Sequence, residues 1–220
     1  MAVAIQSNGS PGVSAAAGTI SLTFNNVSGD RVVGFITGCE NGTNRTVTGI
    51  TYPDSGSVAM ALIVSNPDTD VYVGLWEKTS AATGSNVMKA TWSGGSPACN
   101  LSACSVTGSH ASTASTAGTS VQVASDTTLA FTKTTTPGNG LVACFVLGDN
   151  NASITDTQVL LQNISNAHAG DNGAGAYQDA TGGSDVITVS STVSDRIRGV
   201  GMEIPAAAGG SDTLLGQGVM

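Results

Sequence analysis

The sequence predicts an all-β protein, an antiparallel sandwich of two sheets, and three observations lead to this fold class. Apolar residues recur with a period of two in many short segments, rather than with the 3.6-residue period of a helix. Turn-forming Gly, Asn, Asp and Pro residues separate these segments at intervals of roughly 8–12 residues. The 220 residues suffice for one sizeable β domain, and 40% of them are hydrophobic.

Two segments in the N-terminal half, residues 19–24 and 57–64, alternate as strands with one buried face do. Residues 31–39 are instead apolar on both faces, as expected of a strand in the centre of a sheet. Together with residues 46–52, which follow a break that contains Asn and Gly, they predict a hairpin. The side chains expected on the buried faces of the two alternating strands are Ile20, Leu22, Phe24, Val58, Met60, Leu62 and Val64.

Residues 71–78 predict a strand in which Val73 and Leu75 oppose Tyr72 and Trp76. Because only 4% of the residues are aromatic, we expect Tyr72 and Trp76 to be buried anchors of the core or of a contact between subunits. The alternative is that the two rings stack against a sugar. We take both as candidate interface residues.

The rest of the chain contains further short apolar segments, of which residues 140–148 form the strongest. We expect a surface loop over residues 166–185, which are rich in Gly, Asn and Asp. The Ser- and Thr-rich residues 107–120 predict an exposed connection. The other expected strands are residues 86–92, 100–106, 120–125, 128–133, 158–164, 185–191 and 196–204.

No linker divides the chain, so we expect a single sandwich domain over residues 18–205. An extended N-terminal arm precedes it at residues 1–17, and a C-terminal tail follows at residues 206–220. The tail is Gly-rich and cannot bury its own apolar side chains. We expect these side chains to dock on a neighbouring subunit, and they are Leu214, Leu215, Val219 and Met220.

Charged residues make up 10% of the sequence, against roughly 25% in ordinary globular domains. The net charge is −8 and the basic residues form no cluster, which argues against a nucleic-acid partner. No segment approaches the roughly 20 apolar residues of a membrane-spanning helix. The N-terminus lacks the basic region of a signal peptide. Either such a peptide was removed before residue 1, or the chain is made and assembled in the cytoplasm, and the initial Met favours the second expectation.

The four cysteines fall into two groups. Cys39 and Cys144 lie in apolar strands, where a free thiol behaves as a small buried hydrophobe. Cys99 and Cys104 flank an expected turn and are candidates for a local disulfide if the protein meets an oxidising compartment. Their spacing does not match the short Cys spacing of a zinc site.

Candidate catalytic groups are sparse. His110 and His168 lie in expected loops without a nucleophile motif, so we expect both to be solvated. Glu40, Glu77 and Glu203 flank strands, and we expect exposed charges that discourage edge pairing rather than a pair of glycosidase carboxylates. We therefore expect no catalytic residue and no enzyme activity.

Calcium is the metal that the sequence could most readily bind. Asp149 and Asn150 in one segment, and Asp171 and Asn172 in another, carry the oxygen ligands that hard cations prefer. Neither segment matches an EF-hand loop, and Asp-Asn-Gly is an ordinary turn sequence. We expect turns without metal, and no cofactor.

Five segments occur in an order that resembles a known module. They are ITYPDSG (50–56), VGLWEK (73–78), VMKATWSGG (87–95), PGNGLVACFV (137–146) and RGVGMEIP (198–205). This order resembles a jelly-roll-like β-sandwich module of phage virion structural proteins, which is also seen in secreted bacterial proteins. Pro53 and Asp54 stand where that module has glycines. The resemblance covers roughly residues 28–206 and implies a jelly-roll-like architecture without shared catalytic residues.

The resemblance and the composition together predict a phage virion structural protein. We expect a capsid decoration or cement protein, or a fibre or tail component, located in the virion after assembly in the host cytoplasm. Its expected partners are other copies of itself and a major capsid or other virion protein, with no nucleic acid and no membrane. The alternative is a secreted carbohydrate-binding or adhesin module.

Overall fold

The computed structural model confirms the all-β prediction, with antiparallel sheets packed face to face. Within the part of the chain that it describes, the only helical element is the 3-10 turn η1. Among the same residues, no helix has the length and apolar character needed to cross a membrane. The residues described are 2–8, 12–14, 18–27, 30–40, 47–67, 72–93, 98–147, 154–156, 159–168 and 171–208.

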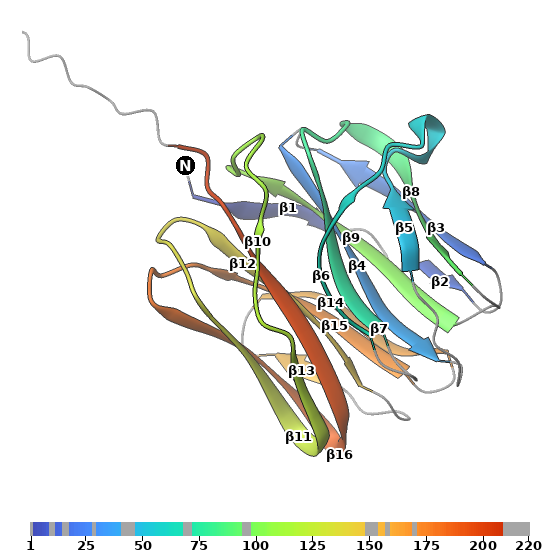
Figure 1. Ribbon diagram of the computed structural model, residues 1–220, viewed down its shortest axis with the longest axis vertical. Helices are drawn as coiled ribbons and strands as arrows, with labels where there is room; N and C mark the ends of the chain where they lie inside the picture. The colour runs from blue at the N-terminus through green and yellow to red at the C-terminus, as the bar shows by residue number, and fades with distance from the viewer. Residues whose placement is uncertain are drawn as a thin grey trace, which may run out of the picture.

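The strands follow one another along the chain and are labelled in Figure 1. Their bounds are β1 (Ala4–Asn8), β2 (Gly12–Ser14), β3 (Thr19–Asn26), β4 (Arg31–Glu40), β5 (Val47–Thr51), η1 (Asp54–Gly56), β6 (Ala61–Pro67), β7 (Tyr72–Thr79), β8 (Gly84–Trp92), β9 (Ala98–Thr107), β10 (Thr116–Ala117), β11 (Val121–Thr134), β12 (Gly140–Leu147), β13 (Ile154–Asp156), β14 (Val159–His168), β15 (Asp171–Asp179) and β16 (Ser184–Ile204).

Two large sheets form the centre of the molecule. The first, called the β4 sheet, has the strand order β1-β9-β4-β7-β6, with β2 also paired to β9. The second, called the β12 sheet, has the order β10-β16-β12-β15-β14, with β11 and β13 also paired to β16. A smaller β8 sheet, of order β3-β8-β5, packs on the face of the β4 sheet that points away from the β12 sheet.

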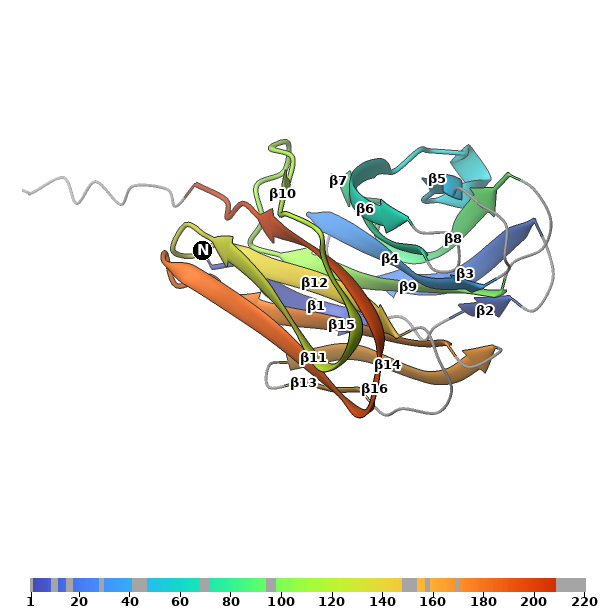
Figure 2. The same ribbon diagram turned by 60° about the horizontal axis from the view of Figure 1, so that its bottom comes forward.

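A fourth layer comes from the long strands β11 and β16. Residues 128–134 of β11 pair with residues 184–190 of β16, and we call this pair the outer ribbon. The second part of β16 pairs with β12, and its residues 197–199 also pair with residues 121–123 of β11. Both long strands bend back between their two parts, as Figure 1 shows. The ribbon therefore folds back over the β12 sheet, at the lower left in Figure 1 and below it in Figure 2.

Each interface between layers has its own hydrophobic core. Ile20, Leu22 and Phe24 of β3 alternate inward as predicted and meet the β4 sheet. The two large sheets enclose a second core, and the outer ribbon and the β12 sheet enclose a third. Because both central sheets are covered on both faces, β4 and β12 carry apolar residues on both sides, which confirms the central strand predicted for residues 31–39.

The predicted hairpin of residues 31–52 is wrong. β4 pairs with β7 and β9, whereas β5 pairs with β8 in the other sheet. The two strands face each other across a core instead of sharing a ladder, because Ile36 on β4 and Ile50 on β5 point into the same hydrophobic cluster. Alternation alone cannot tell a hairpin from two strands in facing sheets.

The predicted strand of residues 57–64 is also wrong in its extent and in the direction of its side chains. β6 begins only at Ala61, and its ladder with β7 shifts register between Leu62 and Val64. Met60 is 7% exposed in the core, whereas Leu62 is 51% exposed. Met60 precedes the strand, and its amide donates a 2.8 Å hydrogen bond to the Ile50 carbonyl oxygen of the β8 sheet, whereas Leu62 pairs with Trp76 in the β4 sheet. The chain passes from one sheet to the other here, so the alternation does not continue across this point.

The surface loop expected over residues 166–185 is instead largely the central strand β15. β15 lies between β12 and β14, and its residues Ala174 and Ala176 are buried against the outer ribbon. A side chain at Gly173 would collide with Thr37 of the β4 sheet. The small residues that resemble a loop are therefore those that a strand needs when both of its neighbouring layers are close.

Part of the segment expected to be an N-terminal arm belongs to the β4 sheet of the same chain. β1 and β2 both pair with β9. Val3 is 1% exposed, and its carbonyl oxygen accepts a hydrogen bond of 2.6 Å from the Tyr177 hydroxyl. The N-terminal strands thus extend the sandwich.

A test of the layer packing compares two glycines in strands. Gly201 of β16 faces the buried ring of Phe131, and an added Cβ would overlap that ring. We expect Gly201→Ala to lower the free energy of unfolding by about 1–3 kcal/mol, which is the usual cost of overpacking. Gly49→Ala is the matched control, because no atom lies within 4 Å of its added Cβ. Urea denaturation of both variants measures this, and equal stability would contradict the packing.

Candidate functional site

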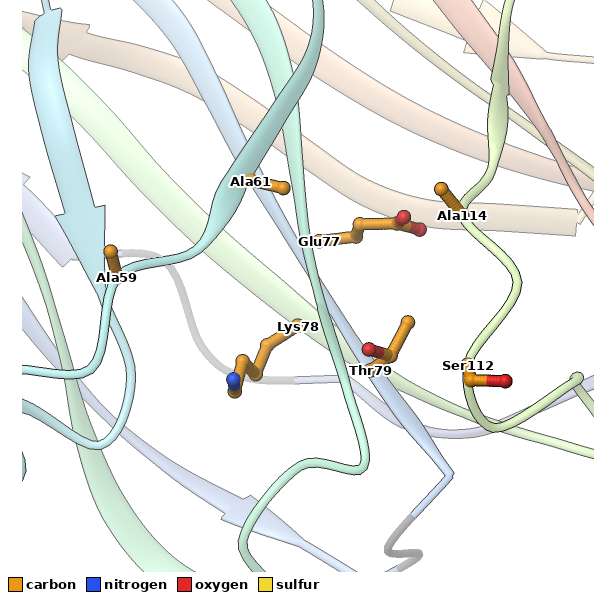
Figure 3. A pocket seen from close by; sticks show the side chains of 7 residues that line it. All are labelled: Ala59, Ala61, Glu77, Lys78, Thr79, Ser112 and Ala114. Atoms are coloured by element: carbon orange, nitrogen blue, oxygen red, sulfur yellow. The ribbon is translucent and has the colours of Figure 1, made fainter.

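The candidate site is a small pocket at one end of the two large sheets, shown in Figure 3. It has a volume of about 180 Å³ and lies between β6, β7 and the loop of residues 108–115. The Glu77 carboxylate points toward the loop that carries Ala114, whereas the Lys78 side chain points away from it (Figure 3). The lining residues are Ala59, Ala61, Glu77, Lys78, Thr79, Ser112 and Ala114.

A buried ion pair lies beside this pocket, and its Glu77 forms part of the wall. Arg31 on β4 and Glu77 on the adjacent β7 are 0% and 3% exposed, and their Nη1 and Oε2 atoms are 2.6 Å apart. Arg31 Nη1 also donates to the Ser115 hydroxyl at 2.5 Å. Its Nη2 donates to the carbonyl oxygens of His110 at 3.0 Å and Thr113 at 2.6 Å. One guanidinium therefore holds the loop of residues 108–115 against the end of the β4 sheet.

The Glu77 carboxylate is fully engaged by these neighbours. Oε1 accepts a hydrogen bond of 3.0 Å from the Ser115 amide, and Oε2 accepts one of 2.6 Å from the Ser115 hydroxyl. Burial lowers the pKa of Arg31, and the charge and hydrogen bond of Glu77 oppose this shift. Because each carboxylate oxygen already accepts bonds, Glu77 is a structural anchor and is poorly placed to move a proton to a ligand.

The expectation that Glu77 and Glu203 are exposed charges at strand edges is wrong. Glu203 on β16 is 8% exposed. Its Oε1 accepts hydrogen bonds of 2.7 Å from the Thr136 amide and from Asn139 Nδ2. Asn139 in turn accepts a bond of 2.8 Å from the Ala206 amide. Like Glu77, Glu203 ties a connecting segment to the end of a sheet.

Asp185 is a third buried carboxylate that anchors a turn. It accepts hydrogen bonds from the Thr135 hydroxyl, from Gln178 Nε2 at 3.2 Å, and from the amide and hydroxyl of Thr181 at 2.8 and 2.6 Å. Burial raises its pKa, but these bonds outweigh burial and leave the pKa lowered. Its stabilising contribution is therefore present above the unfolded-state pKa and is lost as the pH falls through the folded-state value.

The pocket is small and has a mixed lining. Three alanines and the Glu77 carboxylate, which Arg31 neutralises, form one part of the lining, and Lys78, Thr79 and Ser112 form the rest. This mixed lining suits a small side chain of another protein. Among the described residues, no group of three or more His, Cys, Asp and Glu residues is placed to hold a metal ion.

Tyr72 and Trp76 lie inside the molecule, in the core between the β4 and β8 sheets. They are 3% and 2% exposed, with ring centroids 6.0 Å apart and ring planes inclined by 26°. Gly74 separates them, and a side chain there would contact both rings. Within a single chain neither ring offers a face to a sugar or to a neighbouring subunit.

The predicted disulfide between Cys99 and Cys104 is wrong, because both residues belong to the single strand β9. Five residues of extended strand span about 17 Å, which is far beyond the reach of a disulfide. Cys104 is free and buried, as is Cys144. Burial raises the pKa of both thiols above their usual value.

The remaining candidate residues are distributed as follows. His110 is half-buried, and its Nδ1 accepts a hydrogen bond of 3.1 Å from the Thr113 amide, so its ring shapes the loop beside the pocket. Asp171 and Asn172 begin strand β15 rather than a turn. The interface candidates Leu214, Leu215, Val219 and Met220 lie outside the described residues, as do Asp149 and Asn150 and the side chains of Glu40 and His168.

The buried anchors Arg31, Glu77 and Asp185 are what sequence reasoning missed. In the sequence Arg31 follows Asp30 and Glu77 precedes Lys78, as charges at the surface often do, and only the register of β4 with β7 makes Arg31 and Glu77 diagonal neighbours. The sequence matches no protein-family model, and neither a curated protein nor a solved structure matches it significantly.

The ion pair can be tested by comparing it with an exposed one. Glu77→Gln leaves the Arg31 charge buried without a counter-charge, so we expect a loss of about 3–5 kcal/mol in the free energy of unfolding. Lys89→Met is the control, because Lys89 and Asp54 are 3.9 Å apart and roughly one-third exposed. We expect it to cost less than about 1 kcal/mol. Similar losses in the two urea titrations would show that the buried pair is not an anchor.

Proposed function

We propose that this chain is a structural protein of a phage virion, a capsid decoration or cement protein that acts through contacts with other copies of itself and with a shell protein. The observation that carries the proposal is the chemistry of the two outermost faces of the four-layer stack. Both faces consist mainly of short hydroxyl-bearing side chains and expose hardly any charge.

The outer ribbon presents the first of these faces. In residues 128–134 and 184–190, every second side chain is buried, and the others point away from the molecule. Paired partners on the outward side include Thr128 with Ser190 and Ala130 with Thr188. The outward residues are Thr128, Ala130, Thr132, Thr134, Ser184, Val186, Thr188 and Ser190.

The β8 sheet presents the second face, at the opposite end of the stack. Its one charged residue, Lys89, is partly neutralised by Asp54. Val87 is an apolar residue on this face, at 37% exposure. The other outward residues of β3 and β8 are Thr19, Ser21, Thr23, Asn25, Ser85 and Thr91.

Covering such a face with another protein costs little conformational entropy. A threonine or serine side chain loses little rotamer freedom when it is immobilised, whereas a lysine or glutamate loses much more. Flat β faces also offer an even surface against which a neighbouring face can pack. A monomer that stays alone in solution more often carries exposed charges of both signs.

Few of the charged side chains that the structure describes are largely exposed. Among the side chains that the structure describes, Asp126 and Asp179 are the only charged ones that are largely exposed. Arg31, Glu77 and Glu203 are buried in the anchors described above. Among the described residues, these buried charges hold loops of the same chain, and the two outer faces carry little charge that would oppose contact with another protein.

One sheet edge supports the same interpretation. Among the described strands, β6 pairs with β7 only, and its residues Ala61–Pro67 contain no charge. Leu62 on this edge is 51% exposed. The β-bulge and Pro67 of β6 limit backbone pairing at this edge, so the exposed Leu62 beside the pocket favours a side-chain contact with a neighbouring chain rather than the addition of a strand.

The proposal predicts that the chain is a stoichiometric component of purified phage particles. Density-gradient fractions of particles from its source, analysed by mass spectrometry, should contain it together with the shell protein. Thr132→Lys and Thr23→Lys place a charge on each outer face, and at least one should lower its occupancy on particles about tenfold or more. Ser55→Lys, at an exposed turn, is the control and should bind normally.

Two outcomes would contradict this function. The first is recovery of the chain only in particle-free or cell-surface fractions, which would favour the secreted adhesin class. The second is normal particle occupancy of both face variants, which would show that the outer faces do not make the contacts.

A further inference from the structure

The register of two central strands brings two cysteines opposite each other. β4 and β9 are neighbours in the β4 sheet and run antiparallel. After a shift of register between Thr37 and Cys39, Cys39 pairs with Cys99. The last pair of the ladder, Glu40 with Ala98, follows directly. The two cysteines therefore occupy facing backbone positions one residue from the ends of their strands.

This spacing is what a cross-strand disulfide requires. Residues directly opposite in an antiparallel pair have Cα atoms roughly 4.5 or 5.5 Å apart. Both values fall within the range of about 4.4–6.8 Å that disulfides span. The other two cysteines have no such partner, because Cys104 faces Val33 and Asn8, and Cys144 faces Gly175 and Val200.

We propose that Cys39 and Cys99 form an intrachain disulfide when the folded protein leaves a reducing compartment. The oxidant is a small-molecule disulfide of the glutathione class. One cysteine thiolate attacks it and expels a glutathione thiolate, and the second cysteine thiolate then attacks the mixed disulfide and expels the other. The protein loses two protons and two electrons, and the oxidant is reduced to two glutathione thiols.

The bond would join two neighbouring strands of the β4 sheet and close a long loop of the chain. The segment that it closes, residues 39–99, contains β5, β6, β7 and β8. Of these, β5 and β8 belong to the β8 sheet, and β6 and β7 form one edge of the β4 sheet. Cross-links that close long loops stabilise chiefly by restricting the unfolded chain. The oxidised protein is therefore the more stable form outside the cell, and this holds whether the chain is a virion component or a secreted one.

The test uses the full chain, purified in reductant and then incubated with oxidised glutathione. We expect proteolysis without reductant to release a peptide pair joined through Cys39 and Cys99, with a loss of two hydrogen atoms in mass. Alkylation of the unfolded protein should then label Cys104 and Cys144 only. The Tm should rise by roughly 10 °C on oxidation.

Variants separate this bond from other thiol chemistry. Cys39→Ser and Cys99→Ser should each abolish the cross-link and the rise in Tm, whereas Cys104→Ala should keep both. Alkylation of all four cysteines in the oxidised wild type would overturn the proposal. So would a cross-link that joins any other pair or two different chains. The wild-type peptide map decides the matter even if a variant fails to fold.

Discussion

The constraint on which the structure depends is that both large sheets are buried on both faces. The β8 sheet covers one side of the β4 sheet, and the outer ribbon covers the far side of the β12 sheet. The central strands between these covers must therefore be apolar or small on each side, unlike the edge strand β6. Phe145 meets the third core while its neighbour Val146 meets the second, and Gly173 allows Thr37 to approach.

The same constraint decides where the charges lie. A charge inside such a stack must be paired and hydrogen-bonded, and the ends of the sheets are where connecting segments supply the partners. Arg31 with Glu77, Glu203 and Asp185 each tie a loop or turn to a sheet end. With these charges used internally, the outer layers are left with threonine and serine, which is why the proposed contacts are assigned to the outer faces.

Strand alternation predicted much of the fold, because a half-buried strand such as β3 shows its buried face directly in Ile20, Leu22 and Phe24. It failed where small residues do the packing, as in β15, since Gly and Ala are equally typical of loops. It also failed to pair strands, because the partners of β4 and β5 depend on contacts distant in sequence. The site was missed for that reason: Glu77 finds Arg31 and Ser115 only through tertiary structure.

Hydrogen–deuterium exchange of β15 tests burial on both faces most directly, because residues 171–179 are the ones whose composition argues most strongly against it. If the stack is as described, the amides of β15 should exchange as slowly as those of β12, since the two strands share a ladder from Gly140–Asp179 to Leu147–Asn172. Exchange of Gly173–Tyr177 at the rate of an exposed loop, with β12 still protected, would contradict the account.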